Sequence, residues 1–311
     1  MTIFTRRTST QPDVTAPVAD PARPGALRRR RPMLSGTMLL AAALLVGVAV
    51  LVIIVPFLPG YDPYGQDLGR GLLRPMQSFN GDLFPLGTDS LGRDLLSRLA
   101  LAGRVSVLIG LSAVVVSLLI GVTLGLIAGY FRGVAENVIM GLADLQLAIP
   151  RVLLLIAVVA VIGPSVLNLT VLLALTSWVA YGRIARAMAM SLREREFVLS
   201  AVTQGATAGW NIRKHLLPNV VPQMLIVGSF ELGQIIVLEA SLSYLGLGVQ
   251  PPLPSWGLMI SEGQDYLNSN PWLSVLPGIA IFMLVGGVQF LSQRFTAESH
   301  QDLDITAKTS V

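Results

Sequence analysis

Residues 105–131 read VSVLIGLSAVVVSLLIGVTLGLIAGYF, a run without a single aspartate, glutamate, lysine or arginine. An α-helix needs about 20 apolar residues to cross the roughly 30 Å of hydrocarbon in a bilayer, and this run is long enough. Three more uncharged runs cover residues 35–58, 152–182 and 272–293. Across the 311 residues, 53% are hydrophobic and 13% charged, with a mean hydropathy of +0.67. These features predict an all-α membrane protein, since soluble domains carry about 25% charged residues.

The run 152–182 is long enough to hold parts of two spans. A Gly-Pro-Ser turn at 163–165 interrupts it, so one span ends and another begins there. Residues 220–247 are also mostly apolar, although they include Glu231 and Glu239. The sequence therefore predicts six transmembrane helices, at 35–57, 104–130, 137–162, 166–188, 220–246 and 272–292.

Basic residues set the expected orientation, because lysine and arginine accumulate in cytoplasmic segments. Arginines crowd the leader before the first span, and the segment 183–215 is also basic, whereas 248–271 contains no lysine or arginine. Both termini are therefore expected in the cytoplasm. The expected organisation is a disordered cytoplasmic leader at 1–34, a six-helix domain at 35–295 and a cytoplasmic tail at 296–311. Within the domain lie an external segment at about 58–103 and a cytoplasmic loop at about 189–219.

The first apolar run has a second interpretation, a cleaved signal peptide. Its length exceeds the usual apolar core of such a peptide, and no small-residue cleavage pattern follows it, so an anchor is favoured.

Catalytic and metal chemistry has few candidate groups in this chain. There is no cysteine, and the two histidines are His215 and His300. The two lysines, Lys214 and Lys308, do not follow a glycine, so the phosphate-binding motif G-x-x-x-x-G-K-[ST] is absent. We predict neither a metal site nor an enzyme, and any ATP that drives this protein must be bound by another chain. The net charge of +4 reflects the cytoplasmic arginines and does not indicate nucleic-acid binding.

Residues 191–219, SLREREFVLSAVTQGATAGWNIRKHLLPN, form the predicted loop between the fourth and fifth spans. Val198, Ala201 and Val202 follow helical spacing and would form an apolar stripe, which Gly205 would end or bend. A short amphipathic helix in this place either docks into the groove of a partner protein or lies on lipid headgroups. The periodicity leaves both interpretations open.

Four charged residues inside the predicted spans are candidates for a pathway or for contacts between helices. Glu231 and Glu239 are about 80° apart around one helix, so they can share a broad face. They either line a transport pathway or form contacts between helices, because membrane carboxylates usually face the interior of a helix bundle. Asp144 and Arg151 lie on the third span with Pro150 between them. We expect a kink at Pro150 and an ion pair that locks the helix, with a role in transport as the alternative.

The loop 191–219 also carries a resemblance to a known family. Ser200-Ala201, Gly205 and Leu216-Leu217-Pro218 resemble the E-A-A…G…I-x-L-P loop of permeases in binding-protein-dependent ABC importers. In that family the loop forms the coupling helix, which docks into a cleft of the ATPase subunit. Leu199 stands where the family has glutamate, so a charged contact or cap is missing. The residues that the resemblance assigns to ATPase coupling are Phe197, Val198, Ser200, Ala201, Val202, Gly205, Leu216, Leu217 and Pro218.

Two further blocks are similar to the C-type permease of the dipeptide, oligopeptide and nickel branch of that family. The first is LGTDSLGRDLLSR at 86–98, where Thr88 has the chemistry of a helix N-cap. The second, EASLSYLGLGVQPPLPSWG at 239–257, is the more specific match. The resemblance spans about residues 35–295. It makes Asp89, Arg93, Asp94 and Trp256 candidates for an external gate or docking surface.

The resemblance implies a type I ABC importer permease in the bacterial cytoplasmic membrane, in contact with lipid. Its partners would be a second, homologous permease, two ATPase domains that bind ATP and magnesium, and an extracytoplasmic solute-binding protein. The solute would be a short peptide or a similar small molecule, with dipeptides, longer peptides and nickel complexes all open. The alternative is an ion-coupled secondary transporter that uses Glu231, Glu239 and Asp144. Such transporters commonly contain internal repeats, and the two halves of this sequence are not self-similar.

Overall fold

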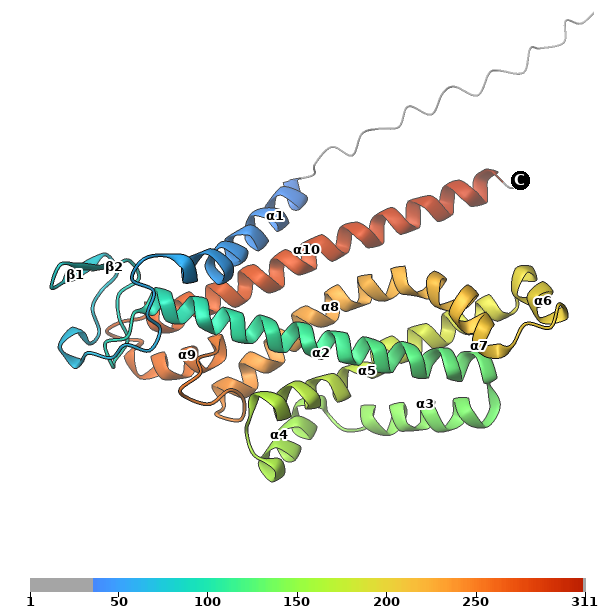
Figure 1. Ribbon diagram of the computed structural model, residues 1–311, viewed down its shortest axis with the longest axis horizontal. Coiled ribbons are helices and arrows are strands. Elements are labelled where there is room, and N and C mark those ends of the chain that lie inside the picture. Colours follow the sequence, from blue (N-terminus) through green and yellow to red (C-terminus); the bar gives the residue numbers. More distant parts are fainter. Residues whose placement is uncertain (1–35, 310–311) are drawn as a thin grey trace, which may run out of the picture. The chain divides into compact units, whose positions relative to one another are not determined.

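The computed structural model describes residues 36–309, with side chains described as far as Ser292 (Figure 1). The leader predicted at 1–34 lies outside these residues. Among the described residues, ten α-helices and one two-stranded antiparallel sheet follow one another along the chain. They are α1 Gly36–Ala49, β1 Gln77–Phe79, β2 Asp82–Phe84, α2 Leu95–Phe131, α3 Gly133–Leu147, α4 Arg151–Ile162, α5 Val166–Arg193, α6 Glu196–Thr203, α7 Ala208–Asn211, α8 Leu217–Tyr244, α9 Trp256–Gly263 and α10 Trp272–Thr309.

Five helical segments of the described chain are long and apolar enough to cross a membrane. Two of them join consecutive elements: α1 continues through a π-helical and a 3-10 turn to Phe57, and α7 continues through a π-helical turn into α8. The spans are Gly36–Phe57, Leu95–Phe131, Val166–Arg193, Ala208–Tyr244 and Trp272–Ser292. The predicted helical membrane fold is thus confirmed, with a small β-hairpin between α1 and α2 added to it.

The predicted third span, 137–162, is a bent pair of helices. Helices α3 and α4 meet at an angle of 88° across a short break, and they make a sixth span if the pair is counted as one. Pro150 lies in the break; it cannot donate a backbone hydrogen bond and its ring crowds the preceding turn, so it favours a break in the helix here. The bend is therefore much larger than the kink expected from the sequence.

Helices α2 and α5 pack closely along a seam of glycines. A Cβ atom on Gly121, Gly125 or Gly129 would lie within 2.6 Å of atoms of α5, including the carbonyl oxygens of Trp178, Gly182 and Arg186. No side chain fits at such distances, so glycine is needed for the two backbones to approach each other. These two helices form the centre of the fold, and Figure 1 shows them running side by side.

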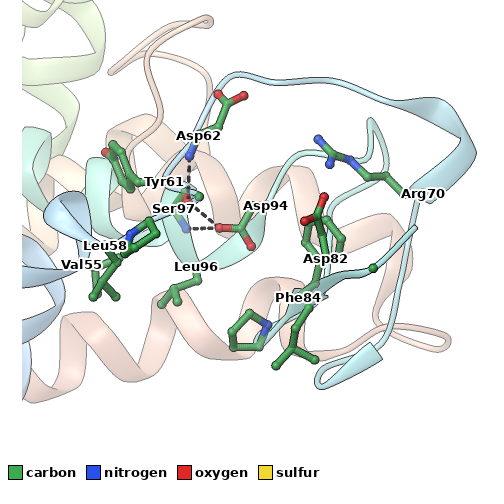
Figure 2. Close-up of a pocket in the computed structure, with 15 residues that line it drawn as sticks. Val55, Leu58, Tyr61, Asp62, Arg70, Asp82, Phe84, Asp94, Leu96 and Ser97 are labelled. Atoms are coloured by element: carbon green, nitrogen blue, oxygen red, sulfur yellow. Dashed lines mark hydrogen bonds between the residues drawn. The ribbon is translucent and has the colours of Figure 1, made fainter. Parts of the chain in front are cut away.

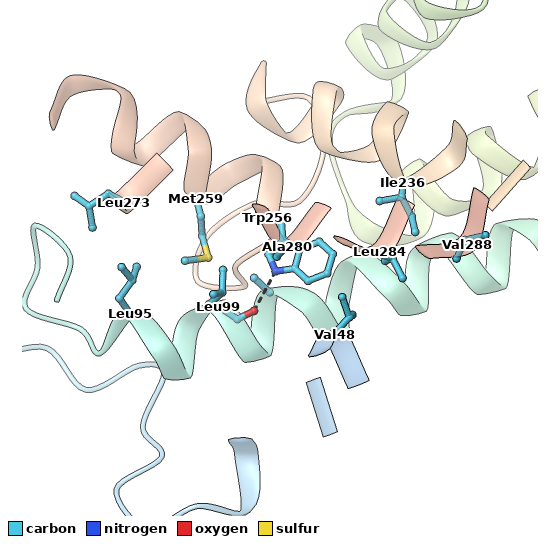
Figure 3. Close-up of a cluster of buried hydrophobic side chains, with 11 residues drawn as sticks. Val48, Leu95, Leu99, Ile236, Trp256, Met259, Leu273, Ala280, Leu284 and Val288 are labelled. Atoms are coloured by element: carbon cyan, nitrogen blue, oxygen red, sulfur yellow. Dashed lines mark hydrogen bonds between the residues drawn. The ribbon is translucent and has the colours of Figure 1, made fainter. Parts of the chain in front are cut away.

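A second core lies between α1, α2, α8, α9 and α10, and Trp256 is at its centre (Figure 3). The indole of Trp256 is fully buried, and its nitrogen donates a hydrogen bond to the carbonyl oxygen of Leu99, 3.1 Å away. Val48, Ile236 and Leu284 belong to the same cluster. This core attaches the first and last spans to the central helices.

The helix of the predicted second span starts earlier than predicted, because α2 begins at Leu95 and not near residue 104. Asp94 caps this helix, with its Oδ2 accepting a hydrogen bond from the backbone nitrogen of Ser97 at 2.8 Å. The expectation that Thr88 is an N-cap was wrong. Its buried hydroxyl accepts from the backbone nitrogen of Leu73 at 2.9 Å and donates to the carbonyl oxygen of Arg70 at 2.5 Å, so it joins two loops.

The last span, Trp272–Ser292, agrees with the predicted 272–292. The backbone of α10 continues as a helix to Thr309, into the segment 296–311 predicted as a cytoplasmic tail.

Candidate functional site

Helices α6 and α7 form the loop that the sequence singled out between α5 and α8. Gly205 turns the chain between them with φ +88°, a conformation that favours glycine. The hydroxyl of Thr207 then caps α7 by accepting from the backbone nitrogen of Trp210. Figure 1 shows α6 and α7 at the end of the helix bundle where α5 ends and the span Ala208–Tyr244 begins. We call residues 196–215 the coupling segment.

The exposed face of the coupling segment differs from the stripe predicted by its periodicity. Val198 is fully buried in the chain's own core, in the same cluster as Leu216 and Val220. It cannot reach a partner protein, because α6 packs this side chain against the helices beneath it. The apolar side chains that remain about half exposed are Phe197, Leu199, Val202 and Trp210. Of the predicted stripe, Val202 is exposed and Ala201 is half-buried, whereas the expectation that Val198 faces a partner was wrong.

Aromatic rings join the parts of the coupling segment. The ring of His215 lies edge-on to Phe197 and to Trp210, with centroids 5.5 Å and 5.0 Å apart. A pocket of about 400 Å³ is lined by Trp210 together with Ala201, Gln204, Gly205, Ala206 and Thr207. Ser200 and Gly205 are exposed, as expected for groups that contact another chain. The Leu-Leu-Pro motif lies where the coupling segment joins α8, with Leu216 buried, Leu217 half-buried and Pro218 exposed.

The predicted ion pair between Asp144 and Arg151 is not formed. The 88° bend between α3 and α4 removes their common face. Asp144 instead accepts from Arg183 on α5 at 2.5 Å. The guanidinium of Arg151 lies 3.8 Å from Glu231 of α8, with Nη1 nearest to Oε2. Each residue thus ties its own half of the bent pair to a different neighbour.

Glu239 is fully buried near the end of α8. Its Oε1 accepts a hydrogen bond from the hydroxyl of Ser243 at 2.8 Å, and Ser106 and Ser255 provide further hydroxyl groups beside it. The Ser243 hydroxyl also accepts from the backbone nitrogen of Val249 at 3.1 Å. This geometry supports the interhelical interpretation of Glu239, since Ser106 belongs to α2 and Ser255 caps α9.

The external candidates form a buried charge network. Asp89 pairs with Arg93 at 2.6 Å and with Arg98 at 3.4 Å, and Arg98 also pairs with Glu262 of α9 at 2.7 Å. Sequence analysis missed Arg98 and Glu262 as site residues. They are 164 positions apart, and the sequence alone does not show that the fold brings them into contact. Trp256 is fully buried beneath this network, so it supports the external surface from below and is not itself a docking contact.

Asp94 lines a second external feature, a pocket of about 400 Å³ between the end of the first span and the start of α2 (Figure 2). Asp62 and Asp82 also line it, together with Arg70, which donates to the carbonyl oxygens of Gly65 and Gly92. Tyr61 closes one side, and burial raises the pKa of its phenol above the ordinary value, with Arg104 opposing the shift. The segment between the first span and α2 is thus hollowed beside the capped end of α2.

Metal ligands are not gathered in residues 36–292, whose side chains the structure describes: no group of three or more histidine, aspartate or glutamate side chains there is placed to hold an ion.

The comparisons with known proteins agree on one kind of protein. The family described as "Binding-protein-dependent transport system inner membrane component" matches residues 121–297. The chain is 39% identical to the di/tripeptide transport system permease protein DppC of Pseudomonas aeruginosa, over 76% of this chain and 78% of that one. It is 40% identical to the glutathione transport system permease protein GsiD of Pectobacterium atrosepticum, over 64% and 66% of the two chains.

A solved structure is similar in fold. A chain of the MetNI methionine ABC transporter, in inward-facing conformations, matches with a TM-score of 0.50 and 19% identity, over 65% of this chain and 95% of that one. At this level of identity the match concerns the arrangement of helices and not the solute.

Proposed function

Because the chain belongs to the family of binding-protein-dependent transport system inner membrane components, we propose that it forms, with a second permease, the pathway by which an ABC importer takes up short peptides or similar small solutes. It is a multi-pass protein of the bacterial inner membrane, with the architecture of a type I importer permease. The peptide solute is supported by relatives named as dipeptide, tripeptide and glutathione permeases.

The observation that carries the proposal is the exposed apolar face of the coupling segment. Phe197, Val202 and Trp210 are about half exposed in a chain whose sequence has no phosphate-binding motif. Burying apolar area contributes about 25 cal/mol per Å², so side chains of this size would supply useful docking energy in a cleft of a separate ATPase. On this proposal ATP and magnesium are bound by two ATPase domains, and this chain catalyses no reaction.

Motion would pass from the coupling segment into the membrane along one helix. The span Ala208–Tyr244 begins inside the segment and carries Glu231 and Glu239. A shift of the segment when the ATPases close on ATP would therefore move α8 against α2 and α5. The second permease would move in the same way, so that the pathway between the pair opens alternately to each side.

The outer surface would receive an extracytoplasmic solute-binding protein. Asp89 and Arg93 fix the external loops through buried ion pairs, and Asp94 fixes the start of α2. We assign them to holding this surface in shape, with Trp256 packed beneath it.

Reconstitution tests the function. The chain is assembled in vesicles with its second permease, ATPase and binding protein, and uptake of radiolabelled dialanine, trialanine and glutathione is measured. We expect uptake of at least one probe that needs ATP and the binding protein. Uptake driven by a proton or sodium gradient without ATP would establish the ion-coupled alternative.

A further inference from the structure

The break between α3 and α4 brings polar side chains from three helices together inside the membrane region. Arg151 is the first residue of α4, Thr176 and Ser177 come from α5, and Glu231 comes from α8. The Nε of Arg151 donates to the Thr176 hydroxyl at 3.3 Å, and Nη2 donates to the Ser177 hydroxyl. These two bonds hold the guanidinium at the bend.

The hydrogen-bonding capacity of Arg151 is only partly used. A guanidinium has five N–H donors, and two are committed to hydroxyl groups. Nη1 lies 3.8 Å from Glu231, well beyond the 2.7–2.9 Å typical of a charge-assisted hydrogen bond. Glu231 Oε2 is itself buried without a hydrogen-bond partner among the described residues. The pair is therefore open enough for Arg151 to bind a second anionic group.

Exposure distinguishes the two partners. The side chain of Arg151 is 29% exposed, whereas that of Glu231 is 11% exposed. Charged side chains in membrane spans face the bundle interior or a water-filled cavity, because contact with lipid is costly. The exposed part of Arg151 is thus expected on the side of the water-filled pathway, with Glu231 behind it.

We propose that Arg151 binds the carboxylate of the transported solute as it passes through the membrane. The argument rests on the proposed function, which places a pathway beside this chain. The free donors of Arg151 complement a carboxylate, and every unblocked peptide has one at its C-terminus. Glu231 neutralises Arg151 when no solute is present. The bend between α3 and α4 holds the guanidinium of Arg151 in this position. If the two helices formed one straight helix, Arg151 would lose its hydrogen bonds to Thr176 and Ser177 of α5.

The test uses the absence of cysteine from this chain. Arg151→Cys is made together with Glu231→Gln, so that neither charge remains, and the whole importer is reconstituted with its binding protein. The thiol is then modified with an aminoethyl, a methyl or a sulfonatoethyl methanethiosulfonate, which leaves a positive, neutral or negative group. Uptake of the peptide probe transported by the unmodified importer is measured. Leu153→Cys, which is exposed on the same helix, is the matched control, and the unsubstituted importer is treated with each reagent.

We expect the positive group at residue 151 to raise uptake about tenfold over the neutral group, and the negative group to lower it. ATP hydrolysis stimulated by the loaded binding protein should persist in all three, and bound peptide should slow the labelling of the thiol. Equal uptake with the positive and neutral groups would overturn the proposal and leave Arg151 as a contact for Glu231. If the unsubstituted importer shows no ATP-dependent uptake at all, the result contradicts the proposed function itself and not the role of Arg151. If the double variant does not accumulate, Arg151→Lys with Arg151→Gln replaces it, and equal uptake by these two overturns the proposal.

Discussion

The guanidinium of Arg98 lies 2.7 Å from the carboxylate of Glu262, and this contact joins the start of α2 to α9 across 164 residues of sequence. Arg98 is 2% exposed and also faces Asp89 at 3.4 Å. The pair therefore attaches three external elements to one another: the loop before α2, the first turn of α2, and α9. We infer that this network keeps the external surface rigid while the membrane helices move.

Replacing Arg98 should destabilise the folded chain. Arg98→Met removes a buried guanidinium from Asp89 and Glu262. Arg93 stays beside both carboxylates, so the cost should be below the value of about 3–5 kcal/mol that is typical of a buried charge left without a partner. The matched control is Arg132→Met, whose ion pair with Glu194 is solvent-exposed and worth less than about 1 kcal/mol. Thermal unfolding of the detergent-purified protein should show a clearly lower midpoint for Arg98→Met only. Equal midpoints for the two variants would contradict the structural role of the network.

The glycine seam between α2 and α5 should not tolerate a single methyl group. In Gly125→Ala the new Cβ would lie 2.4 Å from the carbonyl oxygen of Gly182, so the helices must separate. Gly141→Ala on α3 meets nothing within 4 Å and should be neutral or slightly stabilising, since alanine favours helix. We expect membrane abundance to fall for Gly125→Ala and to stay unchanged for Gly141→Ala. Normal abundance and melting of Gly125→Ala would show that the two helices are not packed in this way.

Single cysteines placed in this chain test its topology. Ser78→Cys and Gln264→Cys are exposed on the side predicted to be external, and both should react with a membrane-impermeant maleimide added to intact cells. Ser200→Cys lies in the coupling segment and should react only after the cells are opened, as should Thr306→Cys. Labelling of Ser200→Cys from outside would reverse the orientation and remove the coupling interpretation.

The ring of His215 should matter for coupling and not for assembly. His215→Ala removes the ring that contacts both Phe197 and Trp210, so the two halves of the coupling segment lose their connection. We expect His215→Ala to insert normally but to hydrolyse several times more ATP per peptide imported, with His215→Phe restoring most of the coupling. If both variants transport with the ATP cost of the unsubstituted importer, the aromatic contacts have no part in coupling.

Much of the fold was predictable because membrane spans depend on local composition. The uncharged runs identified the spans, and the turn at 163–165 correctly separated α4 from α5. The start of α2 was placed too late, because the charged residues in its first turns were taken to lie outside the span that the apolar run forms. Arg98 is one of them, and its charge is neutralised by Asp89 and Glu262, which only the folded chain brings near.

The candidate site was predictable only as a segment. Periodicity found α6 but assigned its apolar face wrongly, since Val198 and Val202 are both apolar and only the packing of α6 decides which is buried. The Asp144–Arg151 pair failed for a related reason. Spacing along a helix predicts a contact only when the helix is straight, and Pro150 ends it.

The central claim, that this permease is driven through its coupling segment by a separate ATPase, is tested most directly by Val202→Asp. Val202 is 47% exposed, so the change leaves the chain's own core intact and places a charge where the apolar contact with the ATPase is expected. Ser191→Asp, which adds the same charge at the exposed end of α5, is the control. The measurement is co-purification of the ATPase with the affinity-tagged permease pair. The account predicts that Val202→Asp inserts and pairs normally but loses the ATPase, while Ser191→Asp retains it; full ATPase association in Val202→Asp would contradict the account.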